Sequence, residues 1–117
     1  MTEQPPELAV VVPFFEEEDA IAPFFAELLP ILHSLDRSFE VLAIDDGSSD
    51  NTFARLADVH ASENRVRVIR FRRNFGQSAA LAAGFAETGA EIVITMDGDL
   101  QNDPGDIPRL LEEIFSF

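Results

Sequence analysis

The chain has 117 residues, 46% of them hydrophobic, which is enough for one domain with a buried core. It contains no cysteine and no lysine, and its eight arginines face 22 acidic residues, giving a formal net charge of −14. This composition excludes a disulfide framework, a thiolate metal site and a Walker A phosphate loop, which needs a lysine. It also argues against nucleic-acid binding, which requires a basic surface.

Hydrophobic runs and turn signals predict four strands that alternate with four helices. Residues 1–7 are polar and acidic, which predicts a disordered lead-in rather than a signal peptide, so the domain is expected to occupy 8–117. The expected strands are 8–13, 39–44, 66–71 and 91–96. The expected helices run from about 17 to 35, from about 50 to 60, from 78 to 87, and onward from Pro104. We expect Pro30 to kink or break the first helix, and Ser49 or Asp50 to cap the second.

This alternation predicts an α/β fold with a mostly parallel sheet of about four strands and helices on both faces. Polar turns follow all four strands, at 13–18, 45–50, 72–77 and 97–101. The carboxyl ends of parallel strands lie at one edge of a sheet, where ligands bind in such folds. We therefore expect a nucleotide and a metal at this edge, with Asp46 accepting from a base N–H and Arg72 or Arg73 pairing with a phosphate.

The fourth turn carries the strongest metal signal. Asp97 and Asp99 flank Gly98 directly after an apolar run, and Gln101 adds a neutral oxygen. Mg²⁺ and Mn²⁺ prefer such oxygen ligands and often share a site with phosphates. An acidic Asp-Gly turn without a metal is the alternative interpretation.

Other polar residues have simpler interpretations. The acidic run 16–19 also fits a solvated helix start, and Asp50 fits a helix cap better than a ligand. Arg72 and Arg73 fit surface ion pairing as well as phosphate contact. His33 and His60 fall on predicted helices away from the strand ends, so we expect neither to be catalytic.

Four segments in order resemble the family 2 glycosyltransferases, and within them most of all the dolichyl- and polyprenyl-phosphate sugar transferases. They are 11–18 (VVPFFEEE), 44–50 (IDDGSSD), 73–77 (RNFGQ) and 96–104 (MDGDLQNDP). The resemblance extends from residue 8 to about residue 114. It implies the nucleotide-binding, Rossmann-like half of a GT-A fold. It departs from the common family pattern at Phe15, Glu16, Gln77 and Gly98.

The resemblance implies a role for each matching residue. Pro13, Phe15 and Glu17 would line the nucleoside pocket, and Asp46 would hydrogen-bond the base. Asp97 would contact the donor sugar or the surroundings of the metal, while Asp99 and Gln101 would bind Mg²⁺ or Mn²⁺. Asp97 and Asp99 are thus the expected catalytic residues, and Arg73 belongs to a further donor- or acceptor-contacting loop.

The implied reaction is the transfer of a hexose, with inversion, from a nucleoside diphosphate sugar to a polyprenyl phosphate. The acceptor phosphate is already anionic, so no strong general base is required. We expect the chain to be the N-terminal portion of a longer enzyme at the cytoplasmic face of the membrane or in the cytoplasm. Acceptor-binding and membrane-associated parts would then follow Phe117. Exposed phenylalanines near Phe14, Phe24 and Phe115 would allow a homodimer.

Three rival functions remain. A phospho-acceptor receiver domain also gathers carboxylates around Mg²⁺, but it needs a lysine at a strand end. A nucleotidyltransferase opens with a glycine-rich basic loop, whereas residues 14–19 are acidic and lack glycine. A nucleotide- or metal-binding module without catalysis is the third rival, and binding without sugar release would identify it.

Overall fold

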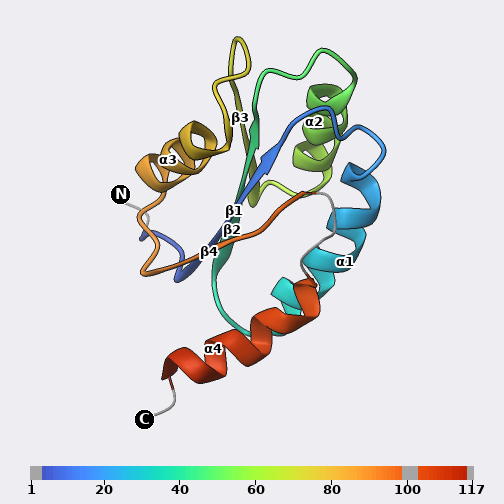
Figure 1. Ribbon diagram of the computed structural model, residues 1–117. Coiled ribbons are helices and arrows are strands. Elements are labelled where there is room, and N and C mark those ends of the chain that lie inside the picture. The colour runs from blue at the N-terminus through green and yellow to red at the C-terminus, as the bar shows by residue number, and fades with distance from the viewer. Residues whose placement is uncertain (1–3, 99–102, 116–117) are drawn as a thin grey trace.

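The structure, a computed structural model that describes residues 4–98 and 103–115, has a central sheet with helices on both faces (Figure 1). The strands are β1 (Leu8–Phe14), β2 (Phe39–Asp45), β3 (Val66–Arg70) and β4 (Ile92–Thr95). The helices are α1 (Ile21–Ser34), α2 (Thr52–Ser62), α3 (Gln77–Glu87), the 3₁₀ turn η1 (Pro104–Asp106) and α4 (Ile107–Phe115). Within these described residues, no helix combines the length and the apolar character that a membrane crossing would require.

The four strands are all parallel and lie in the order β3-β2-β1-β4, which confirms the predicted fold class. Val10 of β1 is paired with Val41 of β2 on one side and with Ile94 of β4 on the other. The chain thus steps outward from β1 to β3 and then returns to the opposite side of β1. The strand order reverses between β1 and β4, and ligands bind at such a switch point in open α/β sheets.

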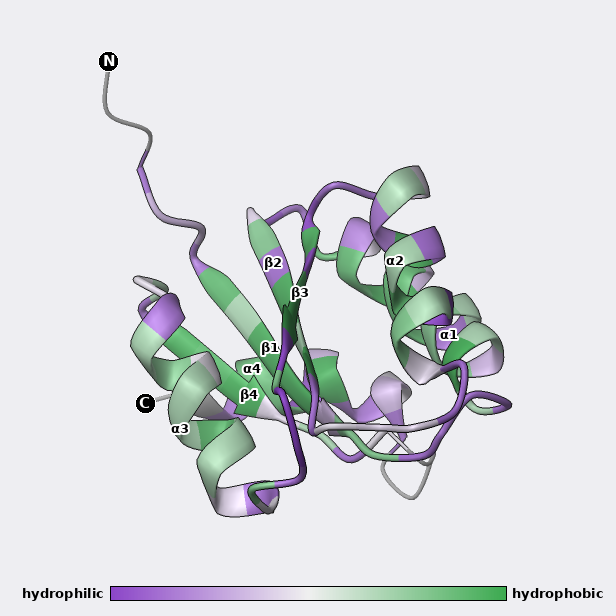
Figure 2. Ribbon diagram, turned by 90° about the horizontal axis from the view of Figure 1, so that it is seen from above, coloured by the Kyte–Doolittle hydropathy of each residue, from purple (hydrophilic) through white to green (hydrophobic). Residues whose placement is uncertain are grey.

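Hydrophobic clusters cover both faces of the sheet. On one face, α1 and α2 bury side chains such as Phe24, Leu28 and Leu56 against β1 and β2. On the other face, α3 packs against Val11 and neighbouring residues (Figure 2). A Cβ atom at Gly84 would lie 2.4 Å from Val11 Cγ1, so this glycine lets α3 approach the sheet closely. The alanine- and glycine-rich helix α3 therefore packs closely on the sheet at this point.

The first helix differs from the prediction at both positions that the sequence singled out. It begins at Ile21 rather than near residue 17, because the acidic residues before it hydrogen-bond to the loop after β2 instead of entering the helix. It also continues through Pro30 to Ser34, so the predicted break is wrong. Pro30 lies on the exposed side of α1, where water can satisfy the carbonyl that loses its helical partner.

Smaller corrections concern the ends of elements. β1 extends one residue past Pro13, since the sheet pairing continues to Phe14 opposite Asp45. The N-cap of α2 is Asn51, without a side-chain capping bond, rather than Ser49 or Asp50. Pro104 begins the 3₁₀ turn η1, and the α-helix proper starts at Ile107.

The phenylalanines predicted to drive dimerisation are not surface residues where the structure describes them. Phe14 is 1% exposed and Phe24 is fully buried, and their rings contact one another edge to face at 5.6 Å. This part of the prediction is wrong because the two rings fill the core between β1 and α1. The side chain of Phe115 lies outside the described part of the structure.

Candidate functional site

A pocket of about 270 Å³ opens at the carboxyl edge of the sheet. It lies at the switch point between β1 and β4, and residues from all four strand-end loops line it. They are Pro13, Phe14, Phe15, Glu17, Asp46, Gln77, Asp97 and Gly98. The predicted convergence of the four turns is therefore observed, and five of the predicted site residues share this one pocket.

The floor of the pocket is held by a contact between Phe14 and Gly98. Phe14 is buried among core aromatic rings, whereas Phe15 is 45% exposed beside it. A Cβ atom at Gly98 would lie 2.3 Å from Phe14 Cε1, closer than any real contact allows. The glycine between the two predicted aspartates therefore lets the β4 loop cross directly over the Phe14 ring.

Asp46 lines the pocket with 4% of its surface exposed. Its carboxylate accepts hydrogen bonds from the backbone N–H of Phe75 at 2.8 Å, that of Gly76 at 3.1 Å, and Asn74 Nδ2 at 3.1 Å. Oδ1 receives one of these bonds and Oδ2 receives two, so Oδ1 retains a lone pair for a further donor. The carboxylate is thus held in one orientation by the β3–α3 loop.

The β3–α3 loop in turn reaches the β4 turn. Gln77, the first residue of α3, donates from Nε2 to Asp97 Oδ1 at 3.1 Å. Gly47, with φ of +73°, lies so close to this loop that a Cβ atom would be 2.1 Å from the Arg73 carbonyl carbon. Asp46, Gln77 and Asp97 are therefore positioned as one connected unit around the pocket.

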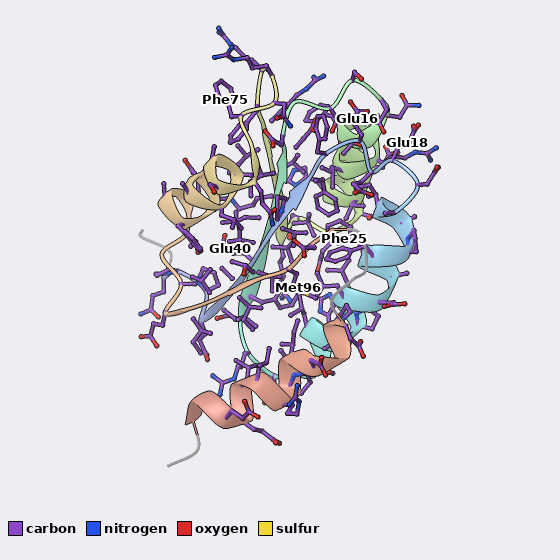
Figure 3. All side chains as sticks on the ribbon, in the orientation of Figure 1. Glu16, Glu18, Phe25, Glu40, Phe75 and Met96 are labelled. Atoms are coloured by element: carbon purple, nitrogen blue, oxygen red, sulfur yellow. The ribbon has the colours of Figure 1, made fainter. Side chains whose placement is uncertain are left out.

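The structure does not bring Arg73 into this pocket. Its guanidinium lies 4.6 Å from the centre of the Phe75 ring, and Phe75 is itself 53% exposed at the tip of the loop (Figure 3). Arg72 is exposed nearby, and the structure records no ion pair for either arginine among the described residues. Both cations thus face solvent beside the pocket rather than its interior.

A second buried carboxylate lies directly before Asp46. Asp45 is fully buried, and its Oδ1 accepts a hydrogen bond from the backbone N–H of Ser48 at 3.0 Å. Its Oδ2 has no hydrogen-bond partner, and the nearest cation is Arg70, with Nε at 4.0 Å. Asp45 does not line the pocket, so it shapes the turn after β2 rather than the cavity.

Asp50 lies in the loop after β2 and does not line the pocket. Burial alone would raise the pKa of its carboxyl, but hydrogen bonds from the Thr52 hydroxyl, the Thr52 N–H and the Glu18 N–H outweigh burial and lower the pKa. The Thr52 N–H is one of the free donors at the start of α2. Asp50 therefore serves the helix start, as expected, although Asn51 occupies the N-cap position.

The predicted metal ligands Asp99 and Gln101 lie outside the described residues, so the structure does not test them. Within 4–98 and 103–115, no three acidic, histidine or cysteine side chains form a group that could hold a metal ion. Asp97, the described member of the motif, presents a hard carboxylate oxygen at the pocket. That donor chemistry fits Mg²⁺ or Mn²⁺.

Sequence reasoning missed two kinds of site residue. Phe14, Gln77 and Gly98 line the pocket but were not assigned to the site, although Gln77 and Gly98 were noted as departures from the family pattern. Ser48, Ser49 and Thr52 hold the first loop in place, a role that the sequence did not indicate, although Ser49 was a candidate cap of the second helix. His33 and His60 lie on α1 and α2 and are not among the lining residues, as predicted.

Residues 9–116 of the chain match the family described as glycosyl transferase family 2. The chain belongs to this family. A dodecaprenyl-phosphate galacturonate synthase from Rhizobium johnstonii is 38% identical over 109 residues, which are 92% of the chain and 32% of that protein. The chain therefore spans about a third of the length of this family 2 relative.

Solved structures show the same fold. A glucosyl-3-phosphoglycerate synthase from Mycobacterium tuberculosis in complex with UDP matches with a TM-score of 0.74 and 26% identity, over 96% of the chain and 41% of that protein. A mannosyltransferase from Pyrobaculum calidifontis, in complex with GDP-mannose and Mn²⁺, matches with a TM-score of 0.64 and 24% identity. This second match covers 82% of the chain and 28% of that protein. The α/β unit thus has the fold of a part of each of these two proteins.

Proposed function

We propose that the chain binds the nucleoside diphosphate sugar of a glycosyltransferase that moves a hexose to a polyprenyl phosphate. The observation that carries this proposal is the pocket at the switch point, to which all four strand-end loops contribute. The name of the Rhizobium relative, a dodecaprenyl-phosphate galacturonate synthase, supports the lipid-phosphate acceptor.

The nucleoside would occupy the side of the pocket that β1 and β2 form. Pro13 and Phe15 offer apolar surface there, and Glu17 offers a polar edge. Asp46 would accept one hydrogen bond from the base through the remaining lone pair of Oδ1. Because three loop donors already orient that carboxylate, it would need little reorganisation when the base arrives.

The diphosphate and the sugar would lie toward β4. Asp97 would contact the sugar or the surroundings of the metal, and Gln77 holds Asp97 in place. Asp99 and Gln101 would hold Mg²⁺ or Mn²⁺, and Arg73 would approach the phosphates from the neighbouring loop. When bound, such a cation neutralises the charge that develops on the departing diphosphate.

The acceptor phosphate is an anionic nucleophile, so the reaction does not require a histidine or another strong base in this segment. Inversion at the anomeric carbon would follow from attack opposite the departing diphosphate. Because the chain spans 32% of the Rhizobium relative, we place acceptor binding and membrane association in the rest of such a protein. The donor site would then face the cytoplasm, where nucleotide sugars are available.

Calorimetric titration of the chain with UDP and with GDP, with and without Mn²⁺, tests this proposal. We expect one nucleotide to bind, and Mn²⁺ to tighten its binding to the wild type but not to Asp99→Ala. Asp58→Ala, which removes one exposed carboxylate from α2, is the control for lost charge. Equal binding by wild type and Asp99→Ala, with or without Mn²⁺, would remove the metal role, and no binding of either nucleotide would overturn the donor site.

A further inference from the structure

Glu16 adopts an unusual backbone conformation at the edge of the pocket. Its φ is +53°, in the left-handed region that side-chain-bearing residues seldom adopt. Such a conformation persists when surrounding contacts hold it, and it is concentrated at functional sites. Glu16 itself is exposed and does not line the pocket, so its role has to be sought in its contacts.

Those contacts all lead to the loop after β2. The backbone N–H of Glu16 donates to Ser48 Oγ at 2.9 Å. In return, Glu16 Oε1 accepts from the backbone N–H of Ser49 at 2.9 Å and from its hydroxyl at 2.8 Å. A charged acceptor strengthens such bonds. The backbone of Glu16 is therefore hydrogen-bonded to Ser48 and its side chain to Ser49, two consecutive residues of the neighbouring loop.

The residues that follow continue this attachment. The N–H of Glu17 donates to Thr52 Oγ1 at 2.9 Å. The N–H of Glu18 donates to Asp50 Oδ2 at 3.4 Å, and Glu18 Oε2 accepts from the N–H of Asn51 at 3.3 Å. Figure 3 shows Glu16 and Glu18 on this segment, beside the N-terminal end of α2. The β1–α1 segment is thus hydrogen-bonded residue by residue to the loop after β2, and its backbone turns at Glu16.

Two residues that line the pocket flank this turn. Phe15 is 45% exposed, so core packing does little to fix its ring, and Glu17 is half-buried on the other side of Glu16. The direction in which both side chains leave the backbone depends on the left-handed turn between them. We propose that Glu16 is a positioning residue, which holds this turn through Ser48 and Ser49 and so presents Phe15 and Glu17 to the nucleoside. This inference rests on the proposed function.

A double-mutant cycle on nucleotide affinity tests the inference. The dissociation constants of UDP and GDP with Mn²⁺ would be measured for wild type, Glu16→Ala, Phe15→Ala and the double variant. We expect Glu16→Ala to weaken binding about fivefold, which is the usual cost of ordering one freed side chain. We expect the double variant to bind at most about twofold more weakly than Phe15→Ala, because Glu16 acts mainly through Phe15, whereas Glu17 is also held by its own bond to Thr52.

Two further variants separate positioning from general destabilisation. Glu16→Gln keeps an oxygen that accepts from Ser49, so we expect it to restore most of the affinity. Glu27→Ala removes an exposed glutamate from α1 and should leave the affinity unchanged. Thermal unfolding of each variant establishes that Glu16→Ala is folded at the temperature of the titration. If Glu16→Ala does not fold, Ser49→Ala, which removes the hydroxyl donor, takes its place in the cycle.

The outcomes distinguish this inference from the proposed function. If the wild type binds a nucleotide but the losses from Glu16→Ala and Phe15→Ala multiply independently, the positioning role is wrong and the donor site stands. Unchanged affinity in Glu16→Ala would have the same meaning. If the wild type binds neither nucleotide, the proposed function fails and the positioning role fails with it.

Discussion

Asp46 and Asp45 show how much two adjacent carboxylates can differ at the scale of single residues. Asp46 accepts from three donors of the β3–α3 loop and faces the pocket. Asp45 is turned the other way, accepts from Ser48, and keeps one oxygen without a hydrogen-bond partner. Side chains alternate along a strand, so consecutive residues at its end face opposite sides of the sheet. Asp46, and not Asp45, is therefore the carboxylate available to a ligand.

Asp50 allows a prediction about pH. Its pKa is lowered in the folded chain, chiefly by Thr52, so its carboxylate stabilises the fold above the ordinary value of 3.8, and this contribution is lost as pH falls through the lowered pKa. We expect Asp50→Asn to lower the free energy of unfolding at pH 7. The difference from wild type should shrink below about pH 4.

Urea unfolding monitored by circular dichroism between pH 7 and pH 2 measures this difference. Asp58→Asn, on the exposed side of α2, is the control for the loss of one negative charge. A difference between wild type and Asp50→Asn that stays constant down to pH 2 would show that the Thr52 and Glu18 hydrogen bonds do not depend on the charge of Asp50.

At the scale of elements, the loops supply the residues of the site, and the strands and helices hold these loops in position. The β1–α1 connection hydrogen-bonds to the β2–α2 connection, which in turn hydrogen-bonds to the β3–α3 connection. The sequence predicted that these turns lie at one edge of the sheet but not that they hydrogen-bond to one another. Gly47 marks the closest approach, between the second and third connections. A residue that appears to be an ordinary turn glycine is thus required by a neighbouring loop 26 positions further along the chain, at Arg73.

Gly47 and Gly76 form a matched pair for testing this approach. Both have positive φ, +73° and +100°, but a Cβ atom would meet the Arg73 backbone at Gly47 and open space at Gly76. Backbone strain alone should make either alanine variant less stable by roughly 1–3 kcal/mol. We expect Gly47→Ala to lose clearly more than Gly76→Ala in urea unfolding, and to bind nucleotide more weakly. Equal losses in the two variants would argue that the loops can separate without cost.

At the scale of the whole molecule, the order β3-β2-β1-β4 places the pocket beside the central strand. β1 and its neighbour β2 are each paired on both sides and are almost completely buried, so the loops that follow them leave the sheet from well-held strand ends. Helices on both faces keep the four loops at fixed separations. The pocket is therefore a property of the complete fold and not of any one motif.

This dependence predicts that nucleotide binding and folding are lost together. In urea, the fluorescence of a bound labelled nucleotide and the far-ultraviolet circular dichroism should change in one coincident transition. Nucleotide with Mn²⁺ at 100 times the dissociation constant should raise the free energy of unfolding by about 2.7 kcal/mol. The same addition should stabilise Asp99→Ala by much less. Release of nucleotide at clearly lower urea than the loss of helix would mean that the loops open while the sheet remains folded.

The sequence by itself determined the α/β class, the parallel sheet, the order of the elements and the four strand ends at which polar residues gather. It could do so because hydrophobic periodicity and turn residues act locally and are visible in one chain. The motifs near Pro13, Asp46 and Asp97 also indicated most of the residues that line the pocket. The tertiary structure decided which side chains face the pocket, that Arg73 lies beside it, and that Glu16 turns left-handed against Ser48 and Ser49. These outcomes depend on contacts between loops about 30 residues apart in the chain, and no local pattern encodes such contacts.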